Sequence, residues 1–211
     1  KKRGPKPKAI NQEVDSEAKA NLTDPESRIM KTRKGFIQGY NAQTVVSQDQ
    51  VIIACDVVNE CNDFGQLKPK VELAEANLYE IGEEPDKILA DAGYCSQANL
   101  EYMDQPGSAD PYIAVKKDHK QRCENVAAPR GRIPKDMSLK ERMERKLRTK
   151  VGKALYRLRG QIAEAPYGQI KDCRNLAKFL LRGLEKVGGE FDLWCLTHNI
   201  LKLYRHSLVA T

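Results

Sequence analysis

Asp91 stands where a carboxylate can do chemistry, at the end of a short apolar run. Residues 87–91 read Lys-Ile-Leu-Ala-Asp, and Ala-Gly-Tyr follows at 92–94. This pattern predicts a buried strand that ends in a carboxylate and then turns at a glycine. A carboxylate in that place can hold a metal ion above the edge of a sheet. The alternative is that Asp91 accepts hydrogen bonds from backbone N–H groups of its own turn.

Four side chains of types that bind metal ions and phosphate follow between positions 156 and 171. They belong to Tyr156, Arg159, Glu164 and Lys171. At about 100° per residue on a continuous helix, the last three share a face and the tyrosine lies on its flank. A carboxylate between two cations suits a site that handles both Mg²⁺ and phosphate. Ion pairing along a helix surface is the alternative.

The strands that must position these residues are marked by β-branched and apolar runs. Residues 39–46 and 50–58 are rich in such residues and are separated by Ser-Gln-Asp, which predicts an antiparallel hairpin. Residues 87–91 and 112–115 predict two further strands. With the helices between and after them, they indicate a mixed α/β domain with a helical tail.

Helical patterns occupy much of the remaining chain. Thr23-Asp24-Pro25-Glu26 has the composition of a helix start. Asn62-Asp63 is placed to cap a helix whose apolar residues recur from Leu67 to Ile81. Further helices are expected over residues 97–104, over the Lys- and Arg-rich residues 137–159, over 161–171 with a kink or interruption at Pro166, and over the amphipathic residues 191–206.

Length and composition restrict the class of protein. The 211 residues, 40% hydrophobic and 31% charged, are enough for one folded domain. No apolar run approaches the roughly 18 residues of a membrane helix, so a membrane-spanning protein is excluded. Six cysteines are scattered without paired spacing, which indicates reduced thiols rather than a zinc site.

The net charge of +7 is unevenly distributed. Residues 51–110 hold 3 basic and 13 acidic side chains, whereas residues 111–160 hold 16 basic and 5 acidic ones. The cations of the second stretch include Lys116, Lys117, Lys120, Arg130, Arg132, Lys146 and Lys150. Such a stretch is compatible with binding to a DNA backbone, and solvated helix faces that neutralise one another are the alternative. Residues 1–22 predict a basic, polar arm or linker.

Five short motifs follow one another over about residues 20–206. They are Thr-Asp-Pro-Glu-Ser-Arg-Ile-Met at 23–30, Gly-Tyr-Asn-Ala-Gln at 39–43, Ala-Asp-Ala-Gly-Tyr at 90–94, Glu-Ala-Pro-Tyr-Gly-Gln-Ile-Lys at 164–171, and Phe-Leu-Leu-Arg-Gly-Leu-Glu-Lys at 179–186 followed by His-Asn-Ile-Leu-Lys-Leu at 198–203. In this order they resemble the DDE transposases of bacterial insertion sequences. Each motif is weak alone, and the five in sequence are specific.

The resemblance implies a ribonuclease H-like fold, that is, a mixed sheet flanked by helices, with a helical C-terminal segment. Asp91 matches the family's second aspartate and Glu164 its glutamate, and both are implied as catalytic ligands of Mg²⁺ or Mn²⁺. Tyr156, Arg159 and Lys171 match the family's Tyr-Arg-Glu-Lys signature and are implied to bind DNA phosphates. Four residues separate Arg159 from Glu164, where the family has three, which puts the orientation of the arginine in question.

The partners implied by the resemblance are DNA, as transposon ends and target, and a second copy of the chain. The implied location is the bacterial cytoplasm, in association with the nucleoid and not with a membrane.

The family's first aspartate is not evident in this sequence. Asp24 is the only acid in a matching motif ahead of the hairpin, and it is a candidate third catalytic residue. The other interpretation is that the first strand and its aspartate lie upstream of Lys1, because the chain lacks an initial Met. Residues 23–211 are then a partial catalytic domain that is inactive by itself.

The sequence leaves functions of different classes open. One is a transposase that performs metal-dependent strand cleavage and strand transfer at insertion-sequence ends. The alternative is a non-catalytic nucleic-acid-binding protein that keeps the fold and the basic face without the active site. A generic ribonuclease H-like nuclease shares the chemistry but has no need of the Tyr-Arg-Glu-Lys set.

Overall fold

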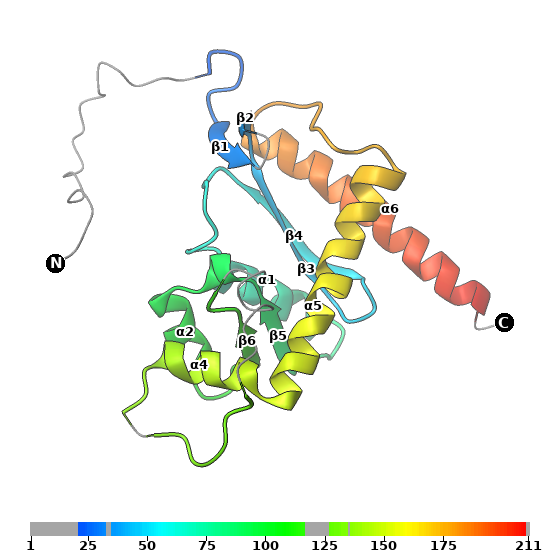
Figure 1. Cartoon of the computed structure of the whole chain (residues 1–211). Coiled ribbons are helices and arrows are strands. Elements are labelled where there is room, and N and C mark those ends of the chain that lie inside the picture. Colours follow the sequence, from blue (N-terminus) through cyan, green and yellow to red (C-terminus); the bar gives the residue numbers. More distant parts are fainter. Residues whose placement is uncertain (1–20, 33–34, 117–126, 135, 210–211) are drawn as a thin grey trace, which may run out of the picture.

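The computed structural model describes residues 21–32, 35–116, 127–134 and 136–209, so nearly all of the predicted arm lies outside the described residues. Four strands come first, helices and strands alternate from α1 to β6, and helices follow to the end of the described residues, which confirms the mixed α/β class (Figure 1). The strands are β1 (Arg28–Thr32), β2 (Gly35–Gly39), β3 (Asn41–Val46), β4 (Ile52–Val58), β5 (Lys87–Ala90) and β6 (Asp110–Ile113). The helices are α1 (Leu67–Tyr79), α2 (Gln97–Met103), α4 (Leu139–Arg148), α5 (Lys150–Gly168) and α6 (Leu184–Val209), with a 3₁₀ turn η1 (Ala92–Tyr94) and a π-helical turn η2 (Gln169–Cys173).

The strands pair into three sheets of two strands each. β1–β2 and β3–β4 are antiparallel, and β5–β6 is parallel. The predicted hairpin and the two later strands are therefore confirmed, whereas the β1–β2 hairpin is an addition. Within the described residues the pairs are not joined into the single mixed sheet that the resemblance implies. Residues of β3 and of β5 both line a cavity.

Two hydrophobic cores hold the elements together. One packs α1, α2, β5, β6 and α4 around the fully buried Ile113. The other packs the β3–β4 hairpin, η2 and α6 around Phe191. α5 reaches both, because Tyr156 packs against the first core and Tyr167 against the second. In Figure 1, α5 accordingly runs from α4 toward the β3–β4 hairpin and α6.

The segment Thr23-Asp24-Pro25-Glu26 does not begin a helix, and that prediction is wrong. It forms a turn that leads into β1. Its carboxylates instead accept hydrogen bonds at the start of α6, from Gly183 N to Asp24 Oδ1 at 3.3 Å and from Leu184 N to Glu26 Oε2 at 2.8 Å. Acidic side chains satisfy the unpaired N–H groups of a helix start and interact favourably with its dipole. The capping composition therefore serves a helix that lies far along the chain.

The basic segment predicted as one helix over 137–159 is divided at Thr149. Thr149 has φ −65° and ψ 159°, which ends α4, and its hydroxyl accepts a hydrogen bond from Gly152 N at 3.0 Å. A threonine in this position caps the new helix. α5 then continues through Pro166 without interruption, and η2 follows it directly. The predicted interruption at the proline is therefore wrong, and the alternative of a kink there stays a prediction.

α6 packs along the β3–β4 hairpin through polar as well as apolar contacts (Figure 1). Asn199 Oδ1 accepts a hydrogen bond from Ile52 N at 2.8 Å, and Asn199 Nδ2 donates one to Ile52 O at 2.8 Å. The side-chain amide thus pairs with β4 as a neighbouring strand would. His198 Nε2 lies 2.8 Å from Gln50 O. The His-Asn pair of the last motif therefore attaches α6 to the hairpin.

Candidate functional site

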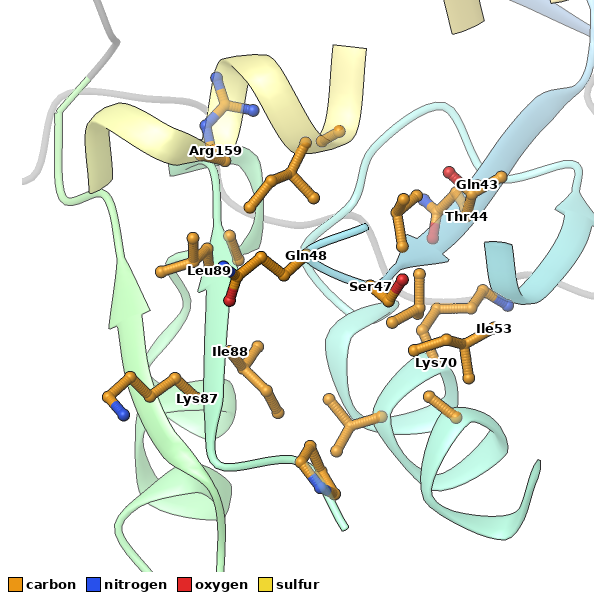
Figure 2. A pocket seen from close by; sticks show the side chains of 18 of the residues that line it. Gln43, Thr44, Ser47, Gln48, Ile53, Lys70, Lys87, Ile88, Leu89 and Arg159 are labelled. Atoms are coloured by element: carbon orange, nitrogen blue, oxygen red, sulfur yellow. The ribbon is translucent and has the colours of Figure 1, made fainter. Parts of the chain in front are cut away.

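A cavity of about 1030 Å³ is lined by residues of both hydrophobic cores. Its walls come from β3 and the turn after it, from α1, from β5 and from α5. Figure 2 shows Ile88 and Leu89 on β5 along one side, and Gln48 extending from the hairpin turn toward Leu89. Arg159 lies on α5 above them. Segments that are distant in the sequence therefore meet around one space.

Asp91 lies at the carboxyl end of β5, where the sequence predicts it, and lines the cavity. Its Oδ1 accepts a hydrogen bond from Gly93 N at 2.8 Å, at the start of η1. The turn interpretation is thus confirmed for this oxygen. It does not compete with metal binding, because a carboxylate offers about four acceptor sites on two oxygens.

Asp63 is a second carboxylate in the cavity, and the sequence did not single it out as a site residue. It does not cap α1, because that helix begins after Gln66 without a side-chain cap. Asp63 Oδ1 instead accepts hydrogen bonds from Asn41 Nδ2 at 2.8 Å and from Gln43 Nε2 at 2.7 Å. The sequence contained one sign of this contact, the spacing of Asn41 and Gln43. Residues two apart in a strand point to the same face, so both amides can reach one carboxylate.

The carboxylates of Asp63 and Asp91 converge on Gly93. A Cβ atom at Gly93 would stand 3.0 Å from Asp63 Oδ2 and 3.0 Å from Asp91 Oδ1. The two oxygens therefore lie within twice that distance of each other. Burial raises the pKa of the neighbouring Tyr94 hydroxyl, and the charges of Asp63 and Asp91 raise it further. A glycine leaves room in this turn for both carboxylates.

Three of the predicted side chains reach the cavity from α5 and η2, namely Arg159, Glu164 and Lys171. Arg159 Nη2 lies 3.6 Å from Glu164 Oε1, and 12% of the arginine side chain is exposed against 69% of the glutamate side chain. Lys171 Nζ lies 5.1 Å from the centre of the Tyr167 ring. The glutamate is thus open to a ligand while its arginine partner is anchored in the wall.

Two tyrosines fix the position of these charged groups. Tyr156 does not line the cavity, and its ring centre lies 5.6 Å from the Arg159 guanidinium. The Tyr167 hydroxyl donates a hydrogen bond to Ala42 O at 2.9 Å, which ties α5 to β3. Burial raises the pKa of Tyr167 to about 12, so this donor keeps its proton throughout the physiological range.

Asp24 is not among the residues that line the cavity. Its buried carboxylate accepts a hydrogen bond from the Tyr40 hydroxyl at 2.6 Å, besides the one from Gly183 N. Burial and the bond to Asp24 raise the pKa of Tyr40 to about 12. These contacts hold the start of α6 and do not place Asp24 beside Asp91.

The polar atoms offered by Gln43, Asp63, Asp91 and Glu164 include oxygens of the kind that Mg²⁺ and Mn²⁺ prefer. In the part of the chain that the structure describes, no three His, Cys, Asp or Glu side chains are grouped as a metal site. Gln43 Oε1, however, is buried and has no hydrogen-bond partner among the described residues. An orphaned carbonyl oxygen on the amide that holds Asp63 fits a hard cation.

Exposed cations lie on α4, on α5 and on the segment before them. They are Arg130, Arg132, Lys140, Arg142, Lys150, Lys153 and Arg157. Lys116 and Lys146 form ion pairs with acidic side chains of the chain itself. Lys117 and Lys120 lie outside the described residues. The predicted basic stretch therefore presents part of its charge to solvent and uses part of it internally.

Comparison with known proteins identifies a family. Residues 9–200 match the family described as Transposase DDE domain. No curated protein matches the chain, and no solved structure matches it. Among the helices of the described residues, none is long and apolar enough to cross a membrane.

Proposed function

The chain belongs to the Transposase DDE domain family, whose members act on DNA, and we propose that the cavity is its active site. In this proposal the protein cleaves DNA at the ends of an insertion element and joins those ends to target DNA, with a divalent metal ion. One observation carries the proposal. Asp91, Glu164 and Lys171 line a single cavity although they come from the end of β5, from α5 and from η2.

Asp91 and Glu164 are the side chains that we assign to hold Mg²⁺ or Mn²⁺. Both are carboxylates that line the cavity, and Glu164 is largely exposed. A bound ion supplies Lewis acidity toward the phosphodiester and stabilises charge on the leaving oxygen. The chain's own part is positioning and charge, because phosphoryl transfer requires little covalent help from side chains.

Arg159 and Lys171 are assigned to the DNA phosphates, and Tyr156 is assigned to position Arg159. Arg159 is anchored by Glu164 and by the Tyr156 ring, so it orients the carboxylate as well as supplying charge. Lys171 is exposed and provides a point charge at the cavity. The exposed cations of α4 and α5 extend the positive charge from the cavity along these two helices. Such contacts position DNA without reading its sequence.

The test uses the full-length protein and a duplex that carries the DNA ends flanking its reading frame. Asp91→Asn and Glu164→Gln are each expected to lower Mg²⁺-dependent cleavage by a factor on the order of 10³ or more. Both variants should retain the duplex in gel shifts. Asp104→Asn, at the exposed end of α2, is the matched control and should keep both properties. Loss of DNA retention together with cleavage would show that the carboxylate is structural.

A second candidate is a DNA-binding protein of the same family without catalysis. The observation that favours it is the lack of a tight group of three acidic side chains in the described residues. Salt-sensitive DNA retention by the wild-type protein, with no cleavage in either Mg²⁺ or Mn²⁺, would establish this candidate in place of the first.

A further inference from the structure

Asp63 is an acidic residue of the cavity that the proposed function leaves without a role. We propose that Asp63, Asp91 and Gln43 Oε1 together bind a divalent cation, so that Asp63 supplies an additional acidic ligand beside the assigned ones. The inference deepens the proposed function and rests on it for what the ion does. The site itself is argued from contacts of the chain.

The carboxylates of Asp63 and Asp91 lie close to one point beside Gly93. Asp63 Oδ2 and Asp91 Oδ1 each lie 3.0 Å from the point where a Cβ of Gly93 would stand. Among the described residues, no ion pair joins either carboxylate to a lysine or arginine. Two like charges at this separation raise each other's electrostatic energy unless a cation lies between or beside them.

Hydrogen bonds from β3 fix the orientation of the Asp63 carboxylate. Its Oδ1 is occupied by the amide N–H groups of Asn41 and Gln43, both from β3. These two donors fix the plane of the carboxylate and leave Oδ2 toward Gly93. Donors that hold one oxygen of a carboxylate while the other faces a cavity are the arrangement that orients a metal ligand.

The side-chain oxygen of Gln43 is buried without a hydrogen-bond partner among the described residues. The residue is 4% exposed and lines the cavity, and its Oε1 has no hydrogen-bond partner among the described residues. Its Nε2 is committed to Asp63, so the amide cannot turn over without losing that bond. Figure 2 places Gln43 on β3 among the residues that surround the cavity. This oxygen is available to a cation in the cavity that it shares with Asp63 and Asp91, and two carboxylates with a neutral amide form an oxygen-only set.

The experiment measures Mn²⁺ binding by the full-length protein without DNA, from the loss of the electron paramagnetic resonance signal of free Mn²⁺. Asp63→Asn and Asp91→Asn should each raise the dissociation constant for Mn²⁺ at least tenfold. Asp104→Asn should leave it unchanged. Thermal melting establishes that each variant is folded. Binding by Asp63→Asn that equals the wild type, or no binding by the wild type, would overturn the proposal.

A second measurement does not depend on any variant. Fe²⁺ that replaces the bound ion, in the presence of ascorbate and peroxide, cuts the polypeptide next to its ligands. The proposal predicts cuts near residues 63 and 93 that Mg²⁺ suppresses. Cuts confined to other parts of the chain, or cuts that Mg²⁺ does not affect, would contradict it.

The outcomes separate the inference from the proposed function. If Mn²⁺ binding depends on Asp63 but the protein cleaves no DNA, the site stands and the proposed function fails. If DNA cleavage requires Asp91 and Glu164 while Mn²⁺ binding is indifferent to Asp63, the proposed function stands and the inference fails.

Discussion

Gly93 is the residue on which the geometry of the acidic centre depends. It lies in η1, which follows β5 after Asp91, and a Cβ atom there would contact the carboxylates of both Asp63 and Asp91. A methyl group there would meet both oxygens at a distance that requires at least one carboxylate to move. The glycine of the Ala-Asp-Ala-Gly-Tyr motif is thus explained by the space that Asp63 and Asp91 need.

Gly93→Ala is expected to lower Mg²⁺-dependent cleavage and Mn²⁺ affinity at least tenfold, because the added methyl group displaces the carboxylates. Gly168→Ala is the matched control. Gly168 is helical, with φ −60°, and a Cβ there meets nothing within 4 Å. Cleavage rates and Mn²⁺ titrations of the two variants check this. Equal activity of Gly93→Ala and wild type would contradict the account of the turn.

His198 makes stability depend on pH. The residue is fully buried, and among the described residues its Nδ1 has no hydrogen-bond partner, so burial lowers its pKa below the ordinary value near 6.5. The charges that lower it further belong to Arg174, Lys202 and Arg205. The folded state therefore binds fewer protons than the unfolded state below pH 6.5, and stability is present above that pH and lost as pH falls.

The prediction is a midpoint of thermal unfolding that drops between pH 7.5 and pH 5. His198→Gln keeps a donor for Gln50 O but does not titrate, so it should flatten this dependence. Melting curves of both proteins at the two values of pH are the measurement. An equal drop of the unfolding midpoint in His198→Gln would show that other titratable groups cause the pH dependence.

At the residue level, the sequence predicts what depends on local order. Asp91 follows its strand directly, and Glu164 lies in a motif, so both positions could be predicted. Asp63, Gln43 and Asn199 could not, because their roles come from hydrogen bonds to residues far away in the chain. The spacing of polar side chains indicates that they share one face of a strand. It does not indicate which carboxylate from a distant part of the chain will hydrogen-bond to that face.

At the scale of elements, the start of α6 shows how a local signal acts at long range. The composition around Asp24 and Glu26 predicts a helix of their own, and they cap α6 instead. The sequence contains the capping chemistry, whereas the identity of the capped helix is set by tertiary packing. In the same way, Thr149 divides a basic segment whose composition is continuous, because one hydroxyl caps a new helix there.

Glu26→Gln is expected to lower the free energy of unfolding by about 0.5–1 kcal/mol, since it removes a charge from the start of α6. Glu80→Gln is a matched control with the opposite sign, because Glu80 is exposed at the carboxyl end of α1, where a negative charge is unfavourable. Urea denaturation of both variants checks the prediction. Destabilisation of similar size by both substitutions would contradict the capping role.

At the scale of the whole molecule, α5 links two cores across a cavity and carries charge along its length. From β3 to β6 the order of strands and helices was predictable, because each of these elements has its own periodicity. The division into two cores and three sheets was not, because it depends on which strands pair. The described strands form three separate pairs instead of the single mixed sheet that the resemblance implies, and the second copy of the chain stays a prediction.

The basic face of α4 and α5 is expected to give the DNA affinity much of its salt dependence. The combined variant Lys140→Gln, Lys150→Gln, Arg157→Gln should make the plot of log affinity against log salt less steep, by up to about 0.9 for each phosphate that these side chains neutralise in the wild type. Lys178→Gln, Arg182→Gln, Lys186→Gln removes the same charge from exposed residues around the start of α6. A larger reduction of the slope by this control variant would indicate that DNA contacts the region around the start of α6 instead of α4 and α5.

The most direct test of the active site exchanges one ligand for a softer one. Asp91→Cys replaces a carboxylate by a thiol, which disfavours Mg²⁺ more than Mn²⁺. We predict that this variant fails to cleave element-end DNA in Mg²⁺ and regains cleavage in Mn²⁺, while Asp104→Cys cleaves in both as the wild type does. Equal cleavage by Asp91→Cys in Mg²⁺ and in Mn²⁺ would show that Asp91 does not hold the catalytic metal ion.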